Sequence, residues 1–495
     1  MTLLAKTGEE EQPAGTQNPK LSRIDKFFQI TERGSTIVRE FRGGIVTFFT
    51  MAYIVILNPL ILGGFGPDAA PVDVAGGWLP AAQVGAVTGL TAGVLTILFG
   101  LVANLPFGLA AGLGINSFLA VAVIGDVTWP EAMGLVAING ILIVVLGATG
   151  ARTAIFRAVP KELKAAITVG IGLFIAFIGF VDSGFVQGTE GGPPVQLGDG
   201  GSISTVPTLV FVVALVCMGI LMARKIQGGL LIGIIVATIL AVIIEAVMKL
   251  GPSGPDNPGG WHLNPPVLPE KFVSIPDFGL IGQFSLFGAF ERVGVLTATM
   301  LVFTLVFTNF FDAMGAMTGL AKSAGLADKS GQFPRLKSAF VIEGLGAVAG
   351  GVTSGSSNTV YVDSAAGIGE GARTGLASVV TGALFLGAMF FTPLTAVVPM
   401  EVAAAALVVV GALMMQQIRE IKFAKFSIAL PAFLTIVTMP LTYSIANGIG
   451  VGFISWVLIR GASGKARKIH PLLWVVAAGF VVYFARGPIT AWLGG

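Results

Sequence analysis

Two polar side chains, Asn309 and Asp312, stand near the end of a long apolar stretch that begins at Val293. An ionised carboxylate inside the hydrocarbon of a bilayer costs about 2.5–3.5 kcal/mol on insertion scales. A spacing of three residues places both side chains on one face of a helix. Because a carboxylate accepts hydrogen bonds and an amide both donates and accepts them, the pair suits a polar ligand at that depth. Gly315 and Gly319 follow near that face and predict a close approach by another helix.

Two further segments carry polar side chains where plain apolar spans are expected. They are "LPFGLAAGLGINSF" (Leu105–Phe118) and "GGVTSGSSNTVYVDSAAGIGEG" (Gly350–Gly371), both rich in small and polar residues. Each has an extended-looking half followed by a helix-like half. Non-helical backbone at membrane depth survives only where protein or a cavity satisfies it. We therefore predict two broken spans that line a binding site, with two loosely packed glycine-rich helices as the alternative.

The composition places these segments in a membrane. Of the 495 residues, 54% are hydrophobic and 11% are charged, and the mean hydropathy is +0.88, whereas soluble domains carry roughly 25% charged residues. The two histidines, His262 and His470, and the single Cys217 predict no metal site and no cofactor. The net charge of +3 is spread over loops, so a nucleic-acid partner is not expected.

Apolar runs of about 20 residues predict an all-α polytopic membrane protein with about 14 transmembrane segments. The expected spans are 43–64, 82–103, 105–124, 131–150, 162–183, 207–223, 229–250, 294–316, 337–353, 355–370, 374–398, 401–417, 428–445 and 446–462. The broken segments are the third of each set of seven, which indicates two inverted repeats. Basic loops after the even-numbered spans place the N-terminus in the cytoplasm. The last apolar run, 471–489, is expected to be an interfacial helix rather than a fifteenth span.

Five stretches make the sequence similar to a known family. They are "TFFTMAYIVILNP", "GLGINSF", "NFFDAMGAM", "YVDSAAGIGEGARTGLASVVTGALF" and "PLTYSIANGIGVGFISWVL". From about Phe27 to Phe484 the chain resembles the AzgA-like purine permeases, which belong to the superfamily of nucleobase–cation symporters and nucleobase–ascorbate transporters. The resemblance implies two inverted repeats of seven spans, with short strands in spans three and ten. It also implies a core domain that moves against a gate domain.

On that scheme the chain divides into six parts. They are a cytoplasmic N-terminal arm with an amphipathic helix (1–42), core parts 43–150 and 293–399, gate parts 151–250 and 400–495, and an extracytoplasmic loop with its lead-in (251–292).

The family's polar positions are only partly retained in this sequence. Asn116 and Asp312 match the family pattern. Asn309 stands where the family usually has Asp, Asp363 where it has a base-contacting Glu, and Glu343 where it has Asp. These departures fall on residues thought to bind the base and to handle a proton, so they bear on substrate and coupling rather than on fold.

The resulting site prediction has two parts. The expected substrate-binding residues are Asn116, Phe118, Asn309, Asp312, Tyr361, Asp363 and Ser364. The candidates for proton coupling are Asp312, Asp363 and Glu343. Structural roles are the alternative: a half-helix cap for Asn116, a hydrogen bond to the backbone of the broken spans for Asp312, an N-cap for Asp363, packing for Phe118 and Tyr361, and a core contact for Glu343.

The predicted function is import of purine nucleobases (adenine, guanine or hypoxanthine) through the plasma membrane. The expected mechanism is proton symport with an elevator-like motion, and the protein could assemble as a homodimer. The alternatives are another substrate on the same fold, such as uracil or xanthine, and a channel. An enzyme is not expected, because the predicted spans contain no histidine and no metal-ligand cluster.

Overall fold

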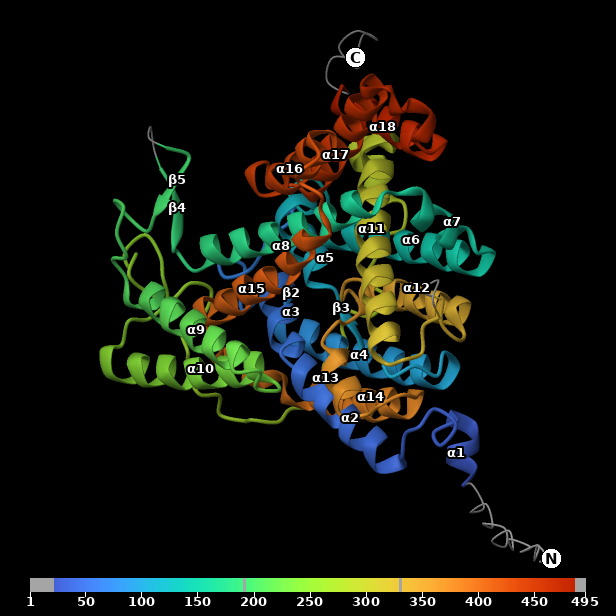
Figure 1. Cartoon of the computed structure of the whole chain (residues 1–495). Helices are drawn as coiled ribbons and strands as arrows, with labels where there is room; N and C mark the ends of the chain where they lie inside the picture. The colour runs from blue at the N-terminus through green and yellow to red at the C-terminus, as the bar shows by residue number, and fades with distance from the viewer. Residues whose placement is uncertain (1–21, 190–192, 329–331, 486–495) are drawn as a thin grey trace, which may run out of the picture.

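The computed structural model describes residues 22–189, 193–328 and 332–485 (Figure 1). Within these ranges, ten helices are long and apolar enough to cross a bilayer. Three apolar helices are shorter, namely Leu113–Val123, Phe426–Leu441 and Pro471–Phe484. The predicted helical, polytopic membrane architecture is confirmed, whereas the number of spans stays a prediction.

One group of helices packs around α4. Its closest pairs are α6 with α12 and α4 with α14, and α11 runs beside α6. The members are α2 (Ile37–Met51), α3 (Ile54–Leu62), α4 (Ala81–Val102), α5 (Leu113–Phe118), α6 (Trp129–Thr149), α11 (Gly288–Ser323), α12 (Leu336–Val352), α13 (Ser364–Gly369) and α14 (Gly375–Ala388). We call this set the first helix group. Inside α11, Gly294 has a non-helical φ of 80°, so the helix is broken near its start.

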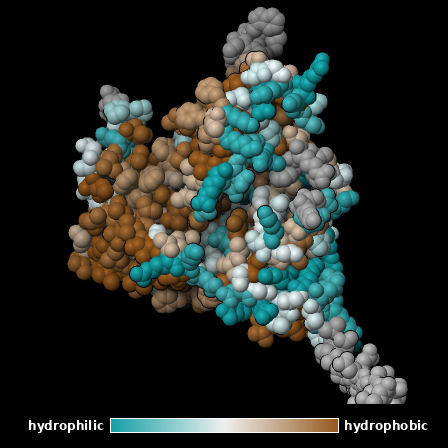
Figure 2. Space-filling model, viewed as in Figure 1, coloured by the Kyte–Doolittle hydropathy of each residue, from teal (hydrophilic) through white to brown (hydrophobic). Residues whose placement is uncertain are grey.

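A second helix group packs around α8 and α15. Its members are α8 (Lys161–Asp182), α9 (Val206–Ala223), α10 (Gly229–Met248), α15 (Met400–Met414), α16 (Phe426–Leu441), α17 (Ile445–Arg460) and α18 (Pro471–Phe484). A short helix, α7 (Ala151–Ala158), connects α6 of the first group to α8. Figure 2 shows apolar side chains gathered where α9 and α10 lie in Figure 1, a surface suited to lipid.

The two broken segments meet as predicted. Strand β3 (Leu109–Ala111) leads into α5 (Leu113–Phe118), and strand β6 (Asn358–Val360) leads towards α13. The strands pair antiparallel, with Ala110 opposite Thr359. Their opposite directions agree with a second half that repeats the first upside down. The prediction of an extended half followed by a helical half is thus confirmed for both segments.

A tight reversal brings β6 back onto α12. Ser354 and Ser356 have left-handed φ values of 56° and 69° in this turn. Gly350 of α12 must be a glycine, because a Cβ there would lie 1.6 Å from the Ser356 carbonyl oxygen. The small residues of "GGVTSGSSN" therefore serve two purposes: they let the backbone segments come close together, and they allow left-handed backbone conformations.

The N-terminal arm differs from its prediction. Instead of one amphipathic helix over 23–44, the structure has α1 (Arg23–Phe28), which ends because Gln29 adopts a left-handed φ of 61°. Helix α2 then starts at Ile37, earlier than the expected 43. The buried Glu40 carboxylate accepts hydrogen bonds from the backbone N–H groups of Arg373 and Thr374 at the start of α14, so the arm is attached to the first helix group. Residues 1–21 of the predicted arm lie outside the described residues.

Two small sheets and a long loop complete the described chain. Strands β1 (Gly63–Gly64) and β2 (Leu79–Pro80) pair in parallel, and β4 (Val186–Gly188) and β5 (Val195–Leu197) pair antiparallel. In the loop before α11, the His262 ring nitrogen Nδ1 lies 2.8 Å from a carboxylate oxygen of Glu401 at the start of α15. The hydrogen bond to this buried carboxylate raises the pKa of His262, since it favours the protonated ring.

Glycines set the distance between α4 and α14. A Cβ on Gly100 would lie 2.4 Å from the Gly375 carbonyl oxygen, and a Cβ on Gly375 would lie 1.9 Å from that of Gly100. By contrast, a Cβ on Gly315 or Gly319 would meet no described atom within 4 Å. The predicted close helix approach at Gly315 and Gly319 is therefore wrong, because both residues are exposed on α11.

We predict that Gly100→Ala lowers the thermal unfolding midpoint of the purified protein. The added methyl group must separate α4 from α14, and overpacking of this kind costs about 1–3 kcal/mol. The control is Gly315→Ala, which adds a methyl group in open space and can gain up to about 1 kcal/mol from helix propensity. Equal midpoints for the two variants would contradict the close packing at Gly100.

Candidate functional site

The crossing of β3 and β6 is held by backbone groups and one serine. The Gly112 N–H donates to the Ser357 carbonyl oxygen at 2.9 Å, and the Tyr361 N–H donates to the Gly108 carbonyl oxygen at 3.0 Å. The buried Ser364 hydroxyl accepts from the Gly108 N–H at 3.0 Å and donates to the Tyr361 carbonyl oxygen at 2.7 Å. Ser364 is one of the predicted substrate-binding residues. In the structure its hydroxyl forms hydrogen bonds to the backbone of both broken segments.

Asp363 precedes α13 and faces the junction of α2 and α3. The Tyr53 hydroxyl donates to its carboxylate oxygen Oδ2 at 3.4 Å, and the Thr50 hydroxyl donates to its carbonyl oxygen at 3.3 Å. The carboxylate forms no side-chain capping hydrogen bond with α13. The Asp363 side chain is half-buried, so it keeps accessible acceptor capacity beyond these contacts.

Two tyrosine rings stand beside this carboxylate. The centroids of Tyr53 and Tyr361 are 6.4 Å apart, with the ring planes at 51°. The Tyr361 hydroxyl donates to the Ala111 carbonyl oxygen of β3, so this ring is fixed across the crossing. Its hydroxyl also lies within electrostatic range of both Asp312 and Asp363. Tyr53 therefore contacts both Asp363 and Tyr361, while Asp312 lies on α11, a helix that packs against β6 and α13.

Asn116 belongs to a buried amide network. Its Nδ2 donates to the Asn58 oxygen Oδ1 at 2.5 Å. The Asn58 amide in turn donates to the Thr88 hydroxyl at 2.7 Å and to the Gly355 carbonyl oxygen at 3.1 Å. This network joins α3, α4 and α5 to the turn before β6. Asn58 was missed by the sequence analysis, although an Asn inside an apolar run is the same signal that singled out Asn309.

Asn309 and Asp312 separate in the structure despite sharing a helix. Asn309 is fully buried, and its amide donates to the Ser357 hydroxyl at 3.0 Å, just before β6. Asp312 is half-buried one turn further on. The Asn309 side chain thus connects α11 to the residue before β6, whereas the Asp312 carboxylate remains accessible.

Many buried polar atoms surround the crossing without a protein partner among the described residues. They are Asn116 Oδ1, Ser117 Oγ, Thr308 Oγ1, Asn309 Oδ1, Ser356 Oγ, Asn358 Oδ1 and Thr359 Oγ1. A buried polar group left unpaired costs about 1–3 kcal/mol, and most such groups in native proteins are hydrogen-bonded. These atoms therefore offer hydrogen-bonding capacity that no described protein group uses.

Phe118 lies in the apolar core. Only 1% of its surface is exposed, which places it among the buried side chains that surround α5. On the same half-helix, a Cβ on Gly114 would lie 2.8 Å from Ile171 Cγ2 of α8. Helix α5 is therefore one of the points where the first helix group touches the second.

Glu343 is paired with a residue that the sequence analysis treated as part of a basic loop. Arg152 of α7 lies 2.5 Å from a Glu343 carboxylate oxygen, and both side chains are fully buried. The guanidinium also lies over the rings of Phe340 and Phe310, 4.4 and 5.2 Å from their centroids. The pair ties α7 to α12 of the first helix group.

Apolar helices interrupted around a buried polar crossing define a class of protein, the membrane transporters with discontinuous helices. A model of the permease family Xan_ur_permease matches residues 39–451, and the chain belongs to this family. It is therefore a membrane permease and not an enzyme.

Curated relatives cover nearly the whole chain. The "Putative permease MJ0326" of Methanocaldococcus jannaschii is 36% identical, with 93% of this chain and 98% of the relative covered. "Guanine/hypoxanthine permease PbuG" of Bacillus subtilis is 35% identical, with 92% and 98% covered. "Adenine permease AdeP" of Escherichia coli is 33% identical, with 94% and 97% covered. These relatives confirm the resemblance drawn from the sequence motifs.

Solved structures support the fold alone. The transmembrane domain of the cyanobacterial bicarbonate transporter BicA superposes with a TM-score of 0.59 at 16% identity, covering 83% of this chain and 96% of that domain. The structure of SLC26A9 gives a TM-score of 0.55 at 12% identity, with 86% and 66% covered.

We predict that the buried Arg152–Glu343 pair couples strongly. Glu343→Gln leaves a buried guanidinium without a counter-charge and should cost about 3–5 kcal/mol, whereas the double variant Arg152→Met/Glu343→Leu should recover most of the loss. The measurement is chemical unfolding of the purified protein in detergent. The control, Lys422→Gln, removes an exposed lysine that lies 3.9 Å from Glu162, a long contact that should be worth below about 1 kcal/mol. Equal losses in the single and double variants would show that the pair is not coupled.

Proposed function

We propose that this permease imports purine nucleobases through the plasma membrane, with its N-terminus in the cytoplasm. The observation that carries the proposal is the half-buried Asp363 carboxylate at the strand crossing, beside Tyr53 and Tyr361. The relatives named as guanine/hypoxanthine and adenine permeases support the substrate class.

The chemistry of a purine suits these groups. The base is flat and neutral, and its rim carries N–H donors and ring acceptors, so a carboxylate can accept from a ring N–H or an exocyclic amine. Aromatic rings such as Tyr53 and Tyr361 offer flat apolar faces to a flat ligand. Asp312, on the neighbouring helix α11, supplies a second half-buried acceptor.

Asp363 also sets the fit of the base. Its carboxylate ends about 1.5 Å short of the position that the family's usual glutamate reaches, because it lacks one methylene group. A hydrogen bond tolerates little of that difference. The base must therefore lie closer to α13, or a water must bridge the gap. Since this departure could favour another base, uracil and xanthine belong in any substrate test.

For coupling, we propose that Asp312 or Asp363 carries the proton. Asn309 cannot titrate, and the Glu343 carboxylate is engaged by Arg152. Asp312 and Asp363 are the two half-buried carboxylates at the crossing, so each can exchange a proton as access changes.

For the transport step, we propose that the first helix group moves against the second as core against gate. Contacts between the groups include α5 with α8 and one polar bridge. In that bridge, Glu370 accepts from the Gln227 amide at 2.6 Å while pairing with Arg42 at 2.6 Å. Such contacts are few compared with those inside each group. A rigid-body displacement of one group against the other would therefore break few contacts.

The direct test is uptake of radiolabelled adenine, guanine, hypoxanthine, xanthine and uracil into proteoliposomes. We expect purine uptake that collapses with a protonophore. Uptake of uracil alone would overturn the purine assignment. Purine uptake that is insensitive to the protonophore would overturn proton coupling while leaving the substrate class intact.

We predict that Asp363→Asn weakens purine binding about ten- to hundred-fold. The substitution keeps the shape of the side chain but removes a charge-assisted hydrogen bond, worth roughly 1.5–3 kcal/mol. The measurement is the concentration for half-maximal uptake, with Asp68→Asn in an exposed loop as the matched control. Unchanged affinity in Asp363→Ala would place the substrate elsewhere.

We predict that Asn309→Asp changes the pH dependence of uptake without changing the preferred base. A second carboxylate one helical turn from Asp312 makes loss of a proton from the pair harder, so the profile should move towards higher pH. The control is Asn309→Ser, which also removes the amide that donates to Ser357 but cannot titrate. A profile identical to that of the Ser variant would exclude position 309 from coupling.

A further inference from the structure

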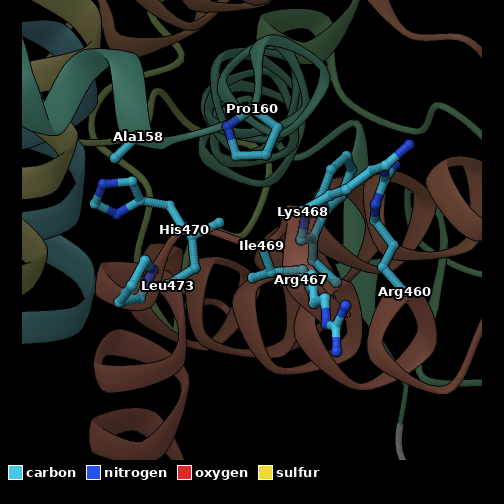
Figure 3. A pocket seen from close by; sticks show the side chains of 10 residues that line it. Ala158, Pro160, Arg460, Arg467, Lys468, Ile469, His470 and Leu473 are labelled. Carbon is cyan, nitrogen blue, oxygen red and sulfur yellow. The ribbon is translucent and has the colours of Figure 1, made fainter. Parts of the chain in front are cut away.

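A cavity of about 440 Å³ lies where four helices of the chain end or begin, and no residue of β3 or β6 lines it (Figure 3). Its walls come from the end of α7, the start of α8, the last turn of α17 and the start of α18, with the turn between α17 and α18. Neither the family assignment nor the proposed transport site accounts for this cavity.

The side chains that line the cavity are basic. Arg460, Arg467 and Lys468 contribute their charges, and His470 lies on the other side of the cavity, near Ala158 and Leu473. The lining contains no acidic residue. Within the described residues, none of the three cationic side chains forms an ion pair, so their charge is available to a ligand.

Two helix N-termini add to the positive potential. Helix α8 begins directly after Pro160 of the cavity wall and has no side-chain cap. Helix α18 begins at Pro471, with His470 as its N-cap. The amino end of a helix carries a partial positive charge and favours anions. Three basic side chains and two helix starts therefore line one space.

The cavity also lies at the ends of apolar helices, where the headgroups of a bilayer are expected. It opens where the apolar helices α8, α17 and α18 reach their ends. Trp456 lines it from within α17, and the Arg460 guanidinium lies 4.8 Å from the centroid of that ring. Trp474 on α18 is 42% exposed nearby. Tryptophan and arginine at helix ends are typical of the membrane–water interface.

We propose that this cavity binds the phosphoryl headgroup of an anionic phospholipid, with Arg460, Arg467 and Lys468 as the phosphate-binding side chains. Arginine and lysine are the usual partners of phosphate. Basic pockets between helices at a membrane surface bind anionic headgroups in this way. The apolar rim around Trp456 and Leu473 favours a lipid over free phosphate, because it accommodates the start of an acyl chain.

The test uses the full-length protein, purified in a neutral detergent. Native mass spectrometry and thermal unfolding are measured with added phosphatidylglycerol, with phosphatidylcholine, and with inorganic phosphate alone. We expect phosphatidylglycerol to bind and to raise the unfolding midpoint more than the other two additives do. The variant Arg467→Gln/Lys468→Gln should bind it about 30-fold more weakly, since each basic side chain contributes about 1 kcal/mol near an anionic headgroup.

The chain offers a matched control in Arg224→Gln/Lys225→Gln. These residues form another exposed Arg–Lys pair in a loop between helices, and they do not line the cavity. An equal loss of lipid in this control would overturn a specific site. Retention of binding in the charge-preserving variant Arg467→Lys would support the role of charge. Equal stabilisation by phosphatidylcholine, or full protection by inorganic phosphate alone, would overturn the lipid headgroup as the ligand.

Discussion

The antiparallel pairing of β3 with β6 is the constraint on which the rest of this structure depends. Backbone that leaves the helical conformation at membrane depth must have its N–H and C=O groups satisfied by protein. Each strand satisfies the other here, with Leu109 opposite Val360 and Ala111 opposite Asn358. The buried amides of Asn58, Asn116 and Asn309 then hold the surrounding helices to the crossing. Polar side chains in the interior are thus first of all a structural requirement of the broken helices.

The need to satisfy the backbone of the broken helices engages some polar side chains near the crossing and leaves others accessible. The hydroxyl groups of Ser364 and Tyr361 form hydrogen bonds with backbone groups across the crossing. Asp312 and Asp363 stay half-buried at its border. The hydrogen-bonded crossing is rigid, and it holds the accessible carboxylates beside it in a constant position. A ligand can therefore bind to them without a rearrangement of the protein.

The sequence was informative where composition alone determines structure. Small polar residues in place of long apolar ones predicted both broken segments, and their third position in each half indicated inverted repeats, whereas the short strands that meet were implied by the resemblance to the family. The sequence did not predict contacts between residues that are far apart in the chain. The partnership of Arg152 with Glu343 spans 191 positions, and nothing in a basic loop shows which arginine will be buried. Similarly, the glycine spacing at Gly315 resembled a packing motif, but only the fold shows which glycines face a neighbouring helix.

The burial of Arg152 has a mechanical consequence. Helix α7 is the covalent link between α6 and α8, and Arg152 fixes its beginning to α12. Motion of α8 relative to that anchor must therefore be absorbed in the few residues at the end of α7, around Val159 and Pro160. A proline there has no N–H to lose, so bending sacrifices no backbone donor at that position. Pro160 also lines the basic cavity, so the phospholipid headgroup proposed to bind there would lie against this connection.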